Sequence, residues 1–156
     1  MLQRKPIIDF GIIGLGRFGY ALASKLAQAN KEVLVLDSSE IKIKQIRNLT
    51  DNAFVVDSLN RETLEQAGIK NCGTVIVCIG ENIEASILTT LNVIELGVPR
   101  VIAKAMSFEH GKVLEKIGAE VIYPEFDMAM RLAERLISSK VLEFIMLSND
   151  MTISEV

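Results

Sequence analysis

Three glycines and one aspartate are the residues whose types and spacing point most directly to chemistry. The segment FGIIGLGRFG carries Gly14, Gly16 and Gly19 in G-x-G-x-x-G spacing, and Asp37 ends the next apolar run. In such a loop the first glycine permits a tight turn, the second lets the backbone approach a pyrophosphate, and the third lets a helix pack closely on a strand. N–H groups at the helix start attract phosphate, and the Asp37 carboxylate can accept hydrogen bonds from two ribose hydroxyls. The spacing predicts a site for a purine nucleotide whose ribose carries no 2′-phosphate.

Several neighbouring residues could contribute to this site, each with a simpler alternative. Arg17 could donate hydrogen bonds to phosphates, or could be a solvated side chain in the first helical turn. Asp57 could accept from the exocyclic amine of adenine, or could cap the next turn. Asp37 itself could serve only as a helix cap beside a tight turn. The nucleotide interpretation also assigns contacts to Phe18, Ser38, Ser58, Ile79, Gly80 and Asn82.

The elements that must position these residues alternate between short β-branched runs and longer stretches of helical period. Strands are predicted at 8–13, 33–36, 53–56, 74–79, 100–104 and 119–122. Helices are predicted at 17–29, 39–48, 60–67, 82–96, 107–117 and 125–139. This alternation is typical of βα units around a parallel sheet. The fold class is therefore α/β: a Rossmann-like, doubly wound, parallel six-stranded sheet with a C-terminal crossover helix, and a ligand crevice where the strand order reverses.

The length of 156 residues fits one main domain. Residues 1–140 are expected to form a nucleotide-binding domain, and residues 141–156 a crossover segment. In helix 82–96 an apolar stripe is expected to pack on the sheet; it consists of Ile83, Ile87, Leu88, Leu91 and Ile94. Helix 125–139 carries more apolar surface than one sheet face requires, so it could pack on a partner chain or be an ordinary packed terminal helix. Its apolar residues are Met128, Ala129, Leu132, Ala133, Leu136 and Ile137.

Composition excludes several classes of function. The chain has 17 Lys and Arg against 20 Asp and Glu, a net charge of −3, which argues against nucleic acid as a partner. Its apolar runs fall short of the roughly 20 residues that span a bilayer, so no direct membrane insertion is expected. Cys72 and Cys78 match neither a C-x-x-C pair nor a zinc spacing and are expected to be reduced and structural, as in a cytoplasmic protein.

A dehydrogenase is the alternative from a different class. Hydride transfer needs a second set of residues to hold the substrate, whereas the βα pattern uses nearly the whole chain. His110 is the one imidazole in the sequence and is expected on a helix surface. No P-loop lysine follows the glycines, so efficient hydrolysis of nucleoside triphosphates is not indicated. Nucleotide binding without turnover is the preferred interpretation, and no catalytic residue is assigned.

Three segments together resemble a known family. FGIIGLGRFG with Asp37, VIVCIGENIEASILTT and VLEKIGAEVIYPEFDMAMRLA are similar to the regulatory RCK (KTN) subunits of bacterial Ktr and Trk potassium-uptake systems, above all the KtrA type, over residues 7–150. The resemblance implies binding of ATP or ADP, with NAD or NADH possible. It also implies homodimers that assemble as an octameric ring on the cytoplasmic side of a potassium-translocating membrane subunit and gate it.

The resemblance assigns roles to individual residues. The phosphate loop would comprise Gly14, Gly16, Arg17 and Gly19, and Asp37 would be the ribose-binding acid. It further implies that Lys104 lies near the same crevice, and that Glu125 contributes to a site for a divalent cation, Mg²⁺ or Ca²⁺. Family members usually continue into a second small lobe, so the chain is expected to be a fragment or a short form.

Overall fold

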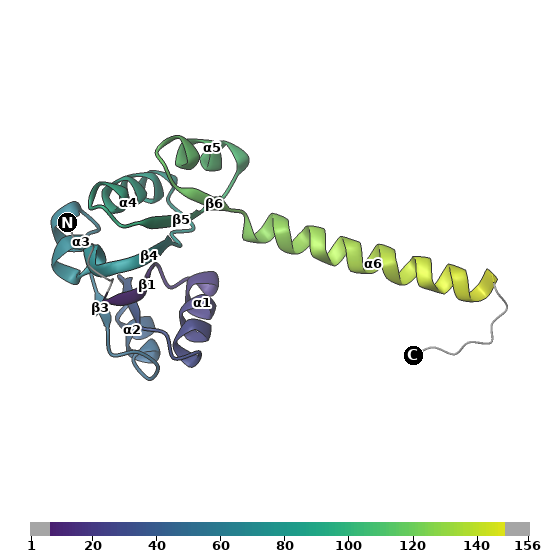
Figure 1. Cartoon of the computed structure of the whole chain (residues 1–156), viewed down its shortest axis with the longest axis horizontal. Helices are drawn as coiled ribbons and strands as arrows, with labels where there is room; N and C mark the ends of the chain where they lie inside the picture. Colours follow the sequence, from purple (N-terminus) through teal and green to yellow (C-terminus); the bar gives the residue numbers. More distant parts are fainter. Residues whose placement is uncertain (1–6, 149–156) are drawn as a thin grey trace, which may run out of the picture. The chain divides into compact units, whose positions relative to one another are not determined.

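The structure is a computed structural model that describes residues 7–148 (Figure 1). It divides into two compact units, Met1–Ile122 and Tyr123–Val156. Of the crossover segment predicted at 141–156, residues 149–156 lie outside the described residues. The division into a domain of residues 1–140 and a crossover segment stays a prediction.

A parallel sheet of six strands organises the first unit, and its order is β3-β2-β1-β4-β5-β6. The strands are β1 (Ile8–Ile13), β2 (Val33–Asp37), β3 (Ala53–Val55), β4 (Cys72–Val77), β5 (Arg100–Lys104) and β6 (Glu120–Ile122). From β1 the chain builds outward through β2 and β3, then returns to the other side of β1 with β4. Ile13 accordingly pairs with Leu36 on one side and with Val77 on the other. This is the doubly wound order, so the predicted fold class is confirmed.

Helices cover both faces of the sheet. They are α1 (Arg17–Gln28), α2 (Glu40–Ile46), α3 (Arg61–Ala67), the 3₁₀ turn η1 (Ile69–Asn71), α4 (Ile83–Glu95) and α5 (Phe108–Lys116). Figure 1 shows α1 and α2 on one side of the sheet and α3, α4 and α5 on the other. Three glycines in the left-handed region, Gly68, Gly97 and Gly118, follow α3, α4 and α5. Each strand and α-helix of this unit matches its predicted position to within two residues at either end, and η1 was not predicted.

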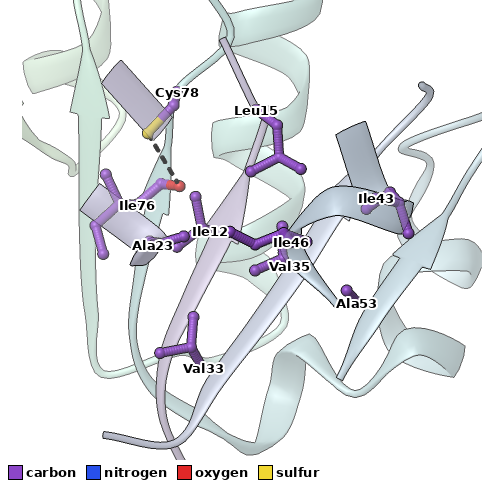
Figure 2. Packing of buried hydrophobic residues seen from close by; sticks show 10 residues of the cluster. All are labelled: Ile12, Leu15, Ala23, Val33, Val35, Ile43, Ile46, Ala53, Ile76 and Cys78. Carbon is purple, nitrogen blue, oxygen red and sulfur yellow. Dashed lines mark hydrogen bonds between the residues drawn. The ribbon is translucent and has the colours of Figure 1, made fainter. Parts of the chain in front are cut away.

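Apolar residues of β1 and β2 pack with α1 and α2 to form a core cluster (Figure 2). Ile12 and Val35 are fully buried in it, as is Ala23 on α1. Cys78, directly after β4, points its thiol towards the carbonyl oxygen of Ile76, 3.9 Å away. Because close-packed side chains have little room to move, this cluster fixes the end of β1 and the start of α1, where the glycine motif lies.

Both cysteines of the chain are free and buried, as predicted. Burial raises the pKa of Cys72 to about 12. It raises the pKa of Cys78 to about 12 as well, although the nearby charge of Lys104 acts in the opposite direction. Both thiols therefore stay protonated and serve as small apolar core groups.

The prediction for the face of α4 is wrong for two of its five residues, Ile83 and Leu88. The side chains that α4 buries are small and mostly hydroxyl-bearing: Ser86, Thr89, Thr90 and Val93. Of the predicted stripe, Ile83 and Leu88 are 45% and 53% exposed, whereas Ile87, Leu91 and Ile94 are half-buried. Small side chains allow α4 to pack closely on the sheet. The hydroxyl of Ser86 pairs with His110, whereas the buried hydroxyl of Thr90 has no hydrogen-bond partner among the described residues.

The second unit contains one long helix, α6 (Pro124–Ser148). It extends well past the predicted end at residue 139, because no glycine or proline interrupts the sequence after Pro124. The helix starts with proline in its first turn, followed by the acidic residues Glu125 and Asp127, as the helix dipole favours. Its large apolar side chains are exposed, among them Met128, Leu132, Leu136 and Ile137. No helix within residues 7–148 has the length and apolar character needed to cross a membrane.

Candidate functional site

The glycine motif forms the turn between β1 and α1, and each glycine has a distinct steric role. Gly14 has a φ of 103°, and a Cβ there would lie 3.0 Å from the carbonyl oxygen of Cys78. A Cβ on Gly19 would collide with the carbonyl oxygen of Gly14. At Gly16 a Cβ would meet nothing within 4 Å, so this position faces open space. This geometry agrees with the three predicted roles: Gly14 permits the tight turn, Gly19 permits the close helix contact, and Gly16 leaves the backbone open to a ligand.

The start of α1 differs from the other helix starts of the first unit. Its N-cap is Gly16, which offers no side chain to the first N–H groups. The remaining α-helices are capped by side-chain oxygens of Ser39, Asn60, Asn82 and Ser107. Within the described residues, no side chain accepts a hydrogen bond from the N–H groups in the first turn of α1. Uncapped N–H groups at a helix N-terminus, next to a glycine turn, are an arrangement that binds phosphate.

Asp37 joins the two loops that border this helix start. Its Oδ1 accepts a hydrogen bond from the N–H of Leu15 at 2.6 Å, and its Oδ2 accepts one from the N–H of Ser39 at 2.8 Å. The helix-cap alternative for Asp37 is wrong, because Ser39 caps α2 through a bond from the N–H of Lys42. A carboxylate offers about four lone-pair positions, so this half-buried group still has acceptor capacity for ribose hydroxyls.

Lys104, at the end of β5, lies in contact with residues of the glycine turn and of the loop after β4. Its Nζ lies 5.9 Å from the centroid of the Phe18 ring. A Cβ on Gly80 would come within 3.1 Å of the same Nζ. The missing side chain of Gly80 therefore leaves room for the ammonium group, and a cation over an aromatic face is stabilised by about 0.5–1 kcal/mol at an exposed site.

The structure brings most of the other predicted residues to the same edge, because parallel strands end together. Arg17 and Ser38 are exposed, and Ile79 is half-buried after β4. Asp57 is exposed after β3. Asn82 serves as a cap, since its Oδ1 accepts from the N–H of Ala85 at 3.0 Å. The hydroxyl of Ser58 accepts from the N–H of Asn60 at 3.2 Å.

Glu125 belongs to the second unit of the chain, where it is exposed in the first turn of α6. Among the residues from 7 to 148, no group of three or more His, Cys, Asp or Glu side chains could hold a metal ion. A divalent cation at Glu125 stays a prediction.

The expectation of a surface histidine is wrong. His110 is only 3% exposed. Its Nδ1 accepts from the N–H of Met106 at 3.0 Å, and its Nε2 lies 3.0 Å from the hydroxyl of Ser86 on α4. Burial lowers the pKa of His110. The available sequence signal was Ser107, which caps α5 and so places His110 in the first turn beside the loop.

The TrkA-N domain family model matches residues 10–124. The chain belongs to the TrkA-N family. As a TrkA-N domain it is 42% identical to Ktr system potassium uptake protein C of Bacillus subtilis (strain 168) over 149 residues, which are 95% of this chain and 67% of that protein. It is 41% identical to Ktr system potassium uptake protein A of the same organism over 148 residues, with 94% and 67% covered. The resemblance to KtrA-type proteins is confirmed.

Two nucleotide-bound structures are similar to this TrkA-N domain. The C-terminal domain of Kef from Shewanella denitrificans, in an AMP-bound form, matches with a TM-score of 0.65 and 26% identity over 88% of this chain and 87% of that one. GsuK bound to ADP matches with a TM-score of 0.58 and 26% identity, covering 76% of this chain and 31% of that one.

Proposed function

We propose that this chain is a nucleotide-binding regulatory subunit of a potassium transporter, acting by binding rather than by catalysis. The observation that supports the proposal is the uncapped start of α1 beside Asp37, whose carboxylate accepts from the N–H of Leu15; the helix start would hold phosphate and the carboxylate the ribose. The two Ktr relatives are potassium uptake proteins, and this favours regulation over the dehydrogenase alternative. The activity of the transporter would then depend on which nucleotide is bound at the site.

The proposed ligands are ATP and ADP, with NAD and NADH as the competing class. The AMP-bound and ADP-bound neighbours share an adenosine 5′-phosphate, and this supports an adenine nucleotide here. In this chain the backbone from Gly14 to Gly19 would hold phosphate, Asp37 the ribose and Asp57 the adenine amine. Further contacts would come from Arg17, Phe18, Ser38, Ser58, Ile79, Gly80 and Asn82.

Lys104 would distinguish ligands by their phosphate chain. It ends β5, two strands away from β1 and on the side opposite to β2 and Asp37. A ligand with its ribose at Asp37 and its first phosphates at the glycine turn therefore extends towards Lys104 with its distal phosphates. An ammonium group there strengthens contacts to a charged terminal phosphate. A positively charged nicotinamide ring gains nothing from the same position, so ATP and ADP should be preferred over NAD.

Assembly is the second part of the proposal. The exposed Ile83 and Leu88 of α4 and the exposed apolar residues of α6 are surfaces that a second copy of the chain could cover. A homodimer, and an octameric ring built from it, would place several nucleotide sites in one cytoplasmic assembly beneath a potassium-translocating membrane subunit. Nucleotides would control such a ring only if they differ in affinity for its two shapes.

A divalent cation would supply that difference in affinity. Glu125 is an exposed acid at the start of α6, and carboxylate oxygens are ligands that Mg²⁺ and Ca²⁺ prefer. With Arg17, it would let a cation and a terminal phosphate connect neighbouring subunits. ATP and ADP would then stabilise different subunit arrangements.

The test is calorimetric titration of the nucleotide-free chain with ATP, ADP, NAD and NADH, each with and without Mg²⁺. We expect ATP and ADP to bind, with Mg²⁺ affecting ATP alone and Glu125→Gln removing that effect. Lys104→Met should weaken ATP about tenfold while leaving AMP unchanged, and Lys112→Met on the exposed face of α5 is the matched control. Preference for NADH over both adenine nucleotides would favour the redox-sensing class, and no binding by any ligand would refute the proposal.

A further inference from the structure

His110 is the one histidine of the chain, and it connects three segments next to the candidate nucleotide site. Its own helix, α5, supplies the ring. Met106, two residues after Lys104, donates its N–H to Nδ1, and Ser86 on α4 faces Nε2. Both Ser86 and the imidazole are buried. Three segments that are separate in sequence are thus joined at one side chain.

The protonation state of the ring follows from its partners. A backbone N–H can only donate, so Nδ1 must carry a lone pair to accept from Met106. The proton of the neutral ring is therefore on Nε2, where it donates to the hydroxyl oxygen of Ser86. A second proton would sit on Nδ1 and face the N–H of Met106, so two donors would oppose each other. Only the neutral imidazole satisfies both contacts.

The two partners border the candidate nucleotide site. The turn that contains Met106 follows Lys104 directly and is also held by a bond from the N–H of Ala105 to the carbonyl of Ile122, at 2.9 Å. Ser86 lies in the first turn of α4, just after Gly80 and the cap Asn82. Loss of the bond from Met106 to His110 would release the turn from α5, while the bond from Ala105 to Ile122 would still hold it to β6.

Among residues 7–148, no charged side chain is paired with the imidazole. The charged side chains on the elements around it are Glu84 and Glu95 on α4, Arg100 and Lys104 on β5, Glu109, Lys112, Glu115 and Lys116 on α5, and Glu120 on β6. All are exposed apart from Lys104, which is half-buried over Phe18, and Arg100 and Glu120 pair with each other. Burial is accordingly the cause that acts on His110.

We propose that His110 is a positioning residue: its neutral ring holds the turn after Lys104 against the start of α4, and its protonation releases that turn and weakens nucleotide binding. The coupling to nucleotide rests on the proposed function. Acid would thus lower the affinity of the site without any titrating group touching the ligand.

The first measurement is NMR of uniformly ¹⁵N-labelled protein, which reports both the imidazole nitrogens and the Met106 amide; a single histidine makes the imidazole assignment unambiguous. We expect the Nε2–H tautomer, a pKa below the ordinary value near 6.5, and a Met106 amide signal that changes along the same titration curve. The Nδ1–H tautomer, or a Met106 amide indifferent to that titration, would overturn the proposal.

The second measurement is the affinity for ADP as a function of pH, compared between the wild type and His110→Asn. The asparagine oxygen can take the place of Nδ1 as acceptor for Met106, and it does not titrate. The terminal phosphate of ADP titrates near pH 6 in both proteins, so the difference between them isolates the imidazole. We expect the wild type to lose about tenfold more affinity than the variant as His110 becomes protonated.

Reciprocity provides a check that needs no variant. If ADP prefers the neutral ring, saturating ADP must lower the pKa of His110 in the wild type by about one unit for a tenfold preference. An unchanged pKa with ADP bound, or identical pH profiles for the two proteins, would overturn the coupling. Absence of ADP binding at pH 7.5 would instead refute the proposed function and the coupling with it, while the tautomer and the Met106 signal would be measured independently.

Discussion

Replacing Asp37 with alanine removes the acceptor for two backbone N–H groups, those of Leu15 at 2.6 Å and Ser39 at 2.8 Å. A hydrogen bond to a charged group contributes about 1.5–3 kcal/mol to stability. Since Asp37 is half-buried, water reaches part of the site and the lower end of that range applies. The expected loss is about 3 kcal/mol in the free energy of unfolding for the two bonds together.

Asp37→Asn separates the two bonds from each other. The asparagine oxygen can accept from one N–H, whereas its NH₂ group would face the other, so we expect about half of the alanine effect. Urea unfolding followed by circular dichroism measures both variants, and an unchanged m-value would show that the unfolded state is comparable. Calorimetry under conditions where each variant is fully folded then reports the separate loss of nucleotide affinity.

Asp51→Ala is the matched control, because Asp51 is an exposed acid with no hydrogen bond or ion pair to residues 7–148. It should change stability by less than about 0.5 kcal/mol and leave nucleotide affinity unaltered. An Asp37→Ala protein as stable as this control would show that the two hydrogen bonds do not hold the loops. If that variant also bound ADP like the wild type, the assignment of Asp37 to the ribose would be refuted.

Three further results are expected. Gly19→Ala should destabilise the fold by about 1–3 kcal/mol, because its Cβ collides with the carbonyl of Gly14. Gly16→Ala should keep full stability but lose nucleotide affinity, since a methyl group there obstructs only the open approach to the backbone. Thermal unfolding measures the first effect and calorimetry the second. The two cysteines, with pKa values near 12, should react with a thiol reagent at pH 8 only after denaturant is added, and rapid labelling of the folded protein would contradict their burial. The contribution of His110 to the free energy of unfolding should be complete above the ordinary histidine pKa near 6.5. It should fall with decreasing pH until the lowered pKa of His110 is passed, because the unfolded state binds its proton first. A His110→Asn protein with the same acid dependence would exclude this residue as the cause.

The sequence predicts that the candidate site residues gather at one edge of the sheet because their order along the chain is enough to place them there. Gly14 follows β1, Asp37 ends β2 and Lys104 ends β5, and parallel strands place such residues on one edge whatever the details of packing. The steric roles of Gly14 and Gly19 also follow from spacing. These features needed no knowledge of distances between segments.

Other features depend on how elements face one another, and spacing does not encode this. Periodicity shows that Leu88 and Leu91 lie on one side of α4 and that Ser86 and Thr90 lie on another, but it does not show which side turns inward. The burial of His110 likewise depends on the rotation of α5 and on Ser86 across from it. The bond from Leu15 to Asp37 requires two loops to meet, and this is a tertiary fact.

The bonds from Asp37 to Leu15 and Ser39 are contacts that the protein makes with itself, so the shape of the glycine loop is set without help from a ligand. A nucleotide that enters a preorganised loop loses little free energy to ordering the chain, and association is then not slowed by a loop that must first close. An empty site should therefore take up a nucleotide quickly, and the rate at which one nucleotide replaces another is set by dissociation of the bound one. In an assembly of such subunits, the lifetime of the bound nucleotide would then set how fast the assembly responds to a change in the cell.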